Sequence, residues 1–125
     1  MMVRVVMLAA VTLSTFPSPA PAKSYRWNCV YTQRASPDGL VKEGNFKLEF
    51  AVDDITGKAV MIGSLGLSDV DVHVGPLAIT FMEKLDGGVV QTTTVAGEGT
   101  SVHSRHSVIG KKMSPSQYYG QCKVQ

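Results

Sequence analysis

Apolar and polar side chains alternate along much of this chain. In NFKLEFAVD, residues 45–53, the apolar side chains of Phe46, Leu48, Phe50 and Val52 occupy every second position. SDVDVHV and LAITFMEKL repeat the pattern further along. Because successive side chains of a β-strand point to opposite faces, a period of two indicates strands with one buried and one wet face.

Short turn sequences separate the alternating stretches at nearly even intervals. They are SPDG (36–39), DDITG (53–57), GSLG (63–66), DGG (86–88), GEG (97–99) and GKK (110–112). The strands predicted between them are Tyr25–Gln33, Asn45–Asp53, Lys58–Ile62, Asp69–Val74, Leu77–Leu85, Val89–Ala96, Thr100–Ile109 and Gln117–Lys123. About eight short strands with hairpin-length links predict an all-β fold, either a small antiparallel up-and-down barrel or a sandwich. We expect its interior to be filled by side chains, without a sizeable ligand cavity.

Residues 1–22 have the three parts of a signal peptide. Arg4 provides the positive start, and VVMLAAVTL is an apolar segment too short to span a bilayer. Ala20 and Ala22 then occupy the two small-residue positions of a cleavage site. We therefore expect an exported protein, periplasmic or secreted, in which residues 23–125 form a single soluble domain.

The charges exclude two classes of partner. Removing Arg4 with the signal peptide lowers the net charge from the +2 of the whole sequence to +1, and the remaining charges are interspersed. No basic stripe suggests nucleic-acid binding. A membrane-spanning barrel needs an apolar outer face, whereas the strand faces opposite the predicted core carry Lys47, Glu49, Asp69 and Asp71. We expect neither nucleic acid nor membrane insertion.

Two cysteines lie near the two ends of the expected mature chain. Cys29 is in the first predicted strand and Cys122 in the last. An exported chain with two cysteines and no C-x-x-C motif predicts one structural disulfide, which would join the terminal strands. Gly120 shares a face with Cys122, and we expect it to leave room for Trp27 or a tyrosine to pack against the bridge.

The segment SVHSRHSVI, residues 101–109, places two histidines and an arginine in one predicted strand. Val102, His106 and Val108 share one face of this strand, and the two valines suggest that this face points inward. His103 and Arg105 would then lie on the outer face. A two-residue turn at positions 98 and 99 would pair Val95 with Val102, Thr93 with Ser104 and Gln91 with His106. In this arrangement His106 is partly buried beside Gln91.

A metal site or a catalytic site is the alternative interpretation of these histidines. His103 and His106 point to opposite faces, so they do not share a metal; His73 would join His103 on the outer face only if their strands were neighbours. No serine stands in a G-x-S-x-G elbow, and Asp53 and Asp54 lie on a turn, where aspartate commonly caps the backbone. We expect no enzyme, no metal and no cofactor.

An exposed aromatic residue completes the candidate interaction surface. In SPSQYYG, Tyr119 falls on the face opposite Tyr118, and exposed aromatic side chains are enriched at interfaces. The candidate surface residues are Tyr119, His103, Arg105 and His73.

Several sequence blocks resemble known families. DDITGKAVMIG, GVVQTTT, SVHSRHSVI and PSQYYGQC are similar to an uncharacterised family of small exported proteins of Gram-negative bacteria, which implies no activity or site residues. WNCVY and YYGQC resemble the cysteine-tied terminal strands of periplasmic inhibitors of c-type lysozyme, which are small eight-stranded barrels. That likeness concerns the fold, because the Ser-Gly-x-x-Tyr inhibitory loop has no counterpart here.

The function expected from the sequence is binding without catalysis, through loops or the outer face of the barrel. The partner is an unidentified protein or a small ligand. Two alternatives are a lipocalin-like carrier of a small apolar ligand, which requires an interior cavity, and a periplasmic lysozyme inhibitor.

Overall fold

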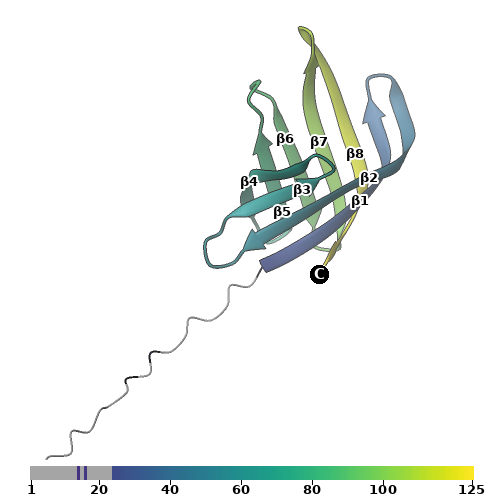
Figure 1. The fold of residues 1–125 in the computed structure, drawn as a ribbon. Helices are drawn as coiled ribbons and strands as arrows, with labels where there is room; N and C mark the ends of the chain where they lie inside the picture. Colours follow the sequence, from purple (N-terminus) through teal and green to yellow (C-terminus); the bar gives the residue numbers. More distant parts are fainter. Residues whose placement is uncertain (1–13, 15, 17–23) are drawn as a thin grey trace, which may run out of the picture.

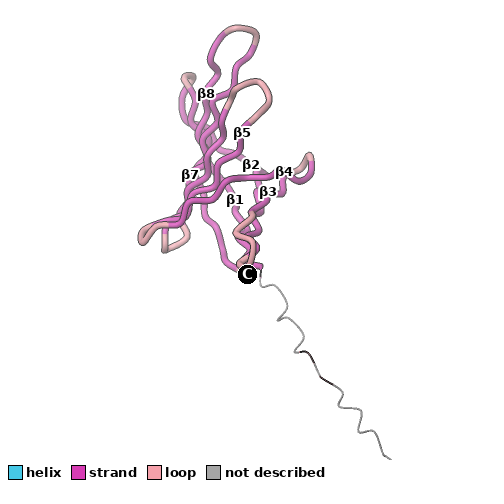
Figure 2. The backbone as a smooth tube through the Cα atoms, turned by 90° about the vertical axis from the view of Figure 1, so that its left-hand side faces the viewer, coloured by secondary structure: helices cyan, strands magenta, loops and turns pink. Residues whose placement is uncertain are grey.

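Eight antiparallel strands close into a barrel in sequence order, β1 to β8 (Figure 1). The computed structural model describes residues 14, 16 and 24–125, so the expected signal peptide lies outside the described residues apart from these two positions. The strands are β1 (Ser24–Ser36), β2 (Gly39–Asp53), β3 (Ala59–Gly63), β4 (Gly66–Val74), β5 (Ala78–Lys84), β6 (Val90–Ala96), β7 (Thr100–Ile109) and β8 (Lys112–Val124). The predicted all-β fold is confirmed, and of the two predicted forms, barrel and sandwich, the chain adopts the barrel, in which hairpin turns join consecutive strands (Figure 2).

The barrel closes where the first strand pairs with the last. Cys29 lies directly opposite Cys122 in the β1–β8 register, and the two form the predicted disulfide. Gly120 lies opposite Tyr31, where a bulge shifts the β1 register. A Cβ at position 120 would overlap the Val30 carbonyl oxygen and lie 2.7 Å from the Tyr31 Cα. The role expected for Gly120 was therefore wrong, because this glycine admits the backbone of β1 rather than an aromatic side chain.

The core occupies the middle of the barrel, where apolar side chains from the inner faces of the strands pack together. Leu48 and Phe50 of β2 are buried, as the alternation predicted, and so is Phe81 of β5. Phe50 stacks on Phe81 with ring centroids 4.2 Å apart, and the Trp27 ring meets Phe81 edge-on. On β1, Cys29 and Tyr31 face the same interior.

The register of β6 against β7 differs from the prediction by one residue. The turn contains three residues rather than two, and Val95 pairs with Ser101 instead of Val102. Gly99 has a φ of 101°, which glycine adopts readily, and its N–H donates to the Ala96 carbonyl. A one-residue shift reverses the facing of every side chain on a strand.

The reversal corrects the predicted facing of β7. Ser101, His103 and Arg105 point inward, whereas Val102 is 36% exposed and His106 is exposed. His106 pairs with Pro115 of β8 and not with Gln91, so its predicted partly buried position was wrong.

The barrel wall is incomplete beside the β3–β4 hairpin. β3 pairs with β2 only along Glu49–Val52, so residues 45–48 of β2 have no partner on β3. On the other side, β4 pairs with β5 only along Asp71–Val74. The hairpin turn between Gly63 and Gly66 therefore projects away from the barrel wall (Figure 2).

The described part of the chain contains no helix with the length and apolarity of a membrane span.

Candidate functional site

The barrel is filled in the middle and hollow towards both ends. The fully buried side chains of the middle are Tyr31, Phe50, Phe81, His103, Thr93 and Cys29. A first cavity of about 740 Å³ lies towards the β3–β4 turn, and a second of about 580 Å³ lies towards the β2–β3, β4–β5 and β6–β7 turns. The expectation that the barrel contains no sizeable cavity was therefore wrong, although the middle is packed as predicted.

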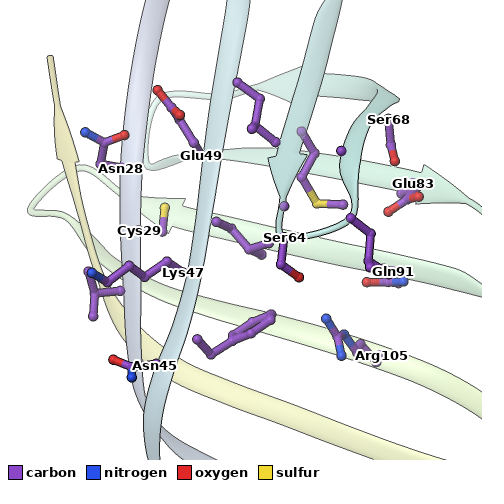
Figure 3. A pocket seen from close by; sticks show the side chains of 18 of the residues that line it. Asn28, Cys29, Asn45, Lys47, Glu49, Ser64, Ser68, Glu83, Gln91 and Arg105 are labelled. Atoms are coloured by element: carbon purple, nitrogen blue, oxygen red, sulfur yellow. The ribbon is translucent and has the colours of Figure 1, made fainter.

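The first cavity is lined mainly by apolar side chains from β2, the β3–β4 hairpin and the end of β5. The inward-facing ones are Phe46, Leu48, Met61 and Leu85, whereas Ile62 pairs with Glu49 on the outer face and Leu65 is fully exposed at the turn. Residues 45–49 of β2 and residues 61–66 of the hairpin face each other across the gap in the wall (Figure 3). The cavity thus opens sideways, at the place where β3 leaves β2.

Three polar side chains cross the inner wall of this cavity in a single row. Glu83 of β5 is opposite Gln91 of β6, and Gln91 is opposite Arg105 of β7. All three line the cavity, and Figure 3 shows them on the side facing β2. We call Glu83, Gln91 and Arg105 the polar row.

Arg105 is held in place by aromatic rings and a histidine. Its guanidinium carbon lies 4.8 Å from the centroid of the Phe46 ring and 5.2 Å from that of Tyr118, distances typical of cation–π contacts. Its Nε donates a hydrogen bond to His103 Nε2 at 3.2 Å. Among the described residues, no carboxylate forms an ion pair with Arg105.

His103 is neutral, and its geometry specifies its tautomer. The side chain is 0% exposed, and its Nδ1 lies 2.6 Å from Thr93 Oγ1. Burial, followed by the nearby charge of Arg105, lowers the pKa of His103 to about 4. Since Nε2 accepts from Arg105, the ring proton lies on Nδ1 and is donated to Thr93. His103 therefore orients the Arg105 side chain while remaining uncharged itself.

A second buried pair lies deeper in the barrel. The Tyr31 hydroxyl is 2.9 Å from Ser101 Oγ, and Ser101 donates to the Thr94 carbonyl at 3.0 Å, so Tyr31 donates to Ser101. Burial raises the pKa of Tyr31 to about 12, with the Ser101 hydrogen bond acting in the opposite direction. These groups satisfy one another, which indicates a structural role.

Glu83 has a carboxylate oxygen without a partner. Its Oε2 is buried, lies in a side chain that lines the first cavity, and has no hydrogen bond within the described chain. Buried polar atoms in native proteins nearly always have a partner. Glu83 was not among the predicted site residues, although extending the Ile79–Phe81 alternation by two positions places it inside.

The predicted interaction surface does not exist as one surface. His103 and Arg105 lie inside the barrel, contrary to the prediction that they face outward. Tyr119 is on the outer face as predicted, where its hydroxyl donates to Gln117 Oε1 at 2.8 Å, and His73 is exposed on β4. β4 and β8 are four strands apart in the closed order, so Tyr119 and His73 lie on different sides.

The candidate pairing of His73 with His103 on a metal is overturned, because the two side chains lie on opposite faces of the wall. No group of three or more potential metal ligands occurs within the described residues. Asp53 accepts hydrogen bonds from the N–H groups of Ile55 and Thr56, which confirms that it caps its turn.

The second cavity lacks a comparable set of converging polar groups. Its lining is largely apolar and includes Tyr25, Trp27, Val74 and Leu77. The two carboxylates on its rim belong to the β2–β3 turn, where Asp53 already binds the backbone. The first cavity is therefore the stronger candidate for specific recognition.

The comparisons with known proteins identify no relative: no family model, curated protein or solved structure matches the chain.

Proposed function

We propose that this protein is a non-enzymatic binding protein that holds a small, largely apolar molecule in the first cavity. The cavity volume of about 740 Å³ supports this proposal most directly. Small-molecule sites typically measure about 300–1,000 Å³ and combine apolar walls with a few converging polar groups. The first cavity has both features, so the carrier alternative is favoured over docking on the outer face.

The proposed setting is outside the cytoplasm. A disulfide between the terminal strands supports export, because such bonds persist in oxidising compartments. The sideways opening beside the β3–β4 hairpin would let a ligand enter without unfolding the barrel. The role is then uptake and release of a small molecule in the periplasm or in the medium.

Binding of the uncharged fluorescent probe N-phenyl-1-naphthylamine tests the proposal. We expect the purified protein to enhance its fluorescence with a dissociation constant in the micromolar range. Gly63→Leu should weaken binding at least tenfold, because a Cβ at Gly63 points towards Leu48 Cδ2 at 3.8 Å and the longer side chain would fill the cavity. Gly87→Leu is the matched control, since a Cβ there meets open space.

Methyl NMR spectra locate the probe. We expect shifts at Leu48 and Met61, which line the first cavity, and none at Ile79, which lines the second. Shifts confined to Ile79 and its neighbours, or no binding at all, would contradict the proposal.

A further inference from the structure

We infer that the first cavity selects an amphipathic hydroxy acid, with its carboxylate on Arg105, its hydroxyl on Glu83 and its alkyl chain along Leu48 and Met61. This inference rests on the proposed binding function and specifies the ligand class. It is based on two members of the polar row. Within the described chain, Arg105 has no carboxylate partner and Glu83 Oε2 has no hydrogen-bond donor.

Arg105 is a permanent cation with unused hydrogen-bonding capacity. An arginine side chain stays charged at all ordinary pH values and has a planar fork that matches a carboxylate. Only its Nε is engaged, by His103, and no carboxylate of the described residues pairs with it. The terminal nitrogens are therefore available to an anion in the cavity.

The surroundings of Arg105 resemble a prepared binding site. Phe46 and Tyr118 lie against the guanidinium, and His103 fixes its Nε, so few rotamers remain to be lost when a ligand binds. His103 is neutral, which leaves Arg105 as the cation of the polar row. Lys47 also lines the cavity, but it is exposed on the β2 side of the opening.

Glu83 has the opposite requirement, because its buried Oε2 needs a hydrogen-bond donor. Neighbouring strands are roughly 5 Å apart, so the Cα atoms of Glu83 and Arg105 are about 10 Å apart with Gln91 between them. Both side chains line the same cavity, so one ligand meets both when its carboxylate and hydroxyl groups are close together, as they are in a 3-hydroxy acid.

Other ligand chemistries satisfy this row less well. An alcohol leaves Arg105 without a counter-ion, an unsubstituted acid leaves Glu83 without a donor, and a quaternary ammonium offers neither an acceptor to Arg105 nor a donor to Glu83. Since hydrogen bonds to charged groups are stronger than those between neutral groups, each unmet requirement should reduce affinity several-fold.

Displacement of N-phenyl-1-naphthylamine by four C12 compounds, below their micellar concentrations at pH 7, tests the inference. We expect dodecanoate to bind at least about tenfold more tightly than dodecan-1-ol. 3-Hydroxydodecanoate should bind more tightly again, by threefold or more, and dodecyltrimethylammonium should bind most weakly. This comparison uses the unmodified protein.

Three variants assign the effects to residues. Arg105→Gln should abolish the preference for the acid while retaining the alcohol, and Glu83→Met, which has no oxygen to accept a hydrogen bond, should abolish the gain from the hydroxyl group. Lys112→Gln removes the same charge at an exposed position of β8 outside the cavity and should change the preference less than twofold. Should Arg105→Gln fail to fold, Arg105→Lys keeps the charge, removes the fork and should reduce the preference partially.

The outcomes separate the inference from the proposed function. Equal displacement by dodecanoate and dodecan-1-ol overturns the carboxylate site, although the cavity still binds. Equal displacement by dodecanoate and its 3-hydroxy derivative overturns the role of Glu83. If the probe itself does not bind, the proposed function fails.

Discussion

His103 connects the packing of the barrel to pH. Its pKa is about 4 in the folded protein, and an exposed histidine in the unfolded chain has a pKa of about 6.5. Between these values the unfolded chain binds a proton that the folded protein excludes. The contribution of His103 to stability is therefore complete above about pH 6.5 and is lost as the pH falls towards 4.

We predict that the free energy of unfolding falls by about 3 kcal/mol from this residue between pH 7 and pH 4. Urea unfolding at a series of pH values measures it. His103→Gln should flatten the curve in this range, because glutamine does not titrate but offers both a donor and an acceptor. His73→Gln, at an exposed position, is the control. Parallel curves for wild type and His103→Gln would show that His103 does not carry the effect.

Gly120 provides a second prediction at the level of one residue. Gly120→Ala should lower the free energy of unfolding by about 3 kcal/mol, because the added Cβ meets the backbone of Val30 and Tyr31, which cannot move aside cheaply. Thermal and urea unfolding measure the loss. Gly44→Ala is the matched control, since a Cβ there meets open space and should cost little. Similar stabilities for the two variants would refute the close approach of β1 and β8.

At the level of the strands, local alternation predicted which elements form but not how they pair. All eight predicted strands exist, because period-two patterns and glycine-rich turns are encoded in short stretches of sequence. The facing of β7 depended on the length of one turn, and the third residue of that turn placed His103 and Arg105 inside. The valines of β7 misled the prediction, since Val102 and Val108 lie on the outer face and are both partly exposed.

Strands β1, β2, β4 and β8 are longer than predicted, and β8 shows that the reason lies in the partner strands. β8 begins at Lys112 although Pro115 has no N–H to donate. β1 pairs with β8 only from Gln117 onward, so Pro115 lies where one edge of β8 has no neighbour. Such edge positions tolerate proline. The sequence also did not predict the opening beside the β3–β4 hairpin, because this opening follows from the unequal lengths of β2 and β3.

At the level of the whole molecule, the all-β class and the disulfide followed from the sequence, whereas the choice of a barrel over a sandwich and the cavity did not. Cys29 and Cys122 are the two cysteines of the sequence, so each had only the other as a partner. The volume of the interior depends on strand pairing and tilt, which residue patterns do not specify. Glu83 and Gln91 entered the candidate site only once three strands were in register.

The disulfide carries the prediction for the whole barrel. It spans 93 residues of sequence, and a cross-link over a loop of this length contributes about 4–5 kcal/mol by restricting the unfolded chain. The double variant Cys29→Ser/Cys122→Ser should lose stability of this order in urea unfolding. A reducing agent should destabilise the wild type and leave the double variant unchanged. Two reactive thiols in oxidised, unfolded wild type would contradict the bond.

Because β1 pairs with β8, the same barrel can form from a chain that starts and ends at other strands. The N–H of Gln125 donates to the carbonyl of Arg26, so the two ends of the described barrel are neighbours in space. A short peptide joining them would leave the ring of eight hairpin-linked strands intact, and new ends could then be cut in the solvent-exposed turn at Gly87. Such a circular permutant keeps both cysteines on adjacent strands, with the sulfur bridge now tying two consecutive strands in the middle of the chain.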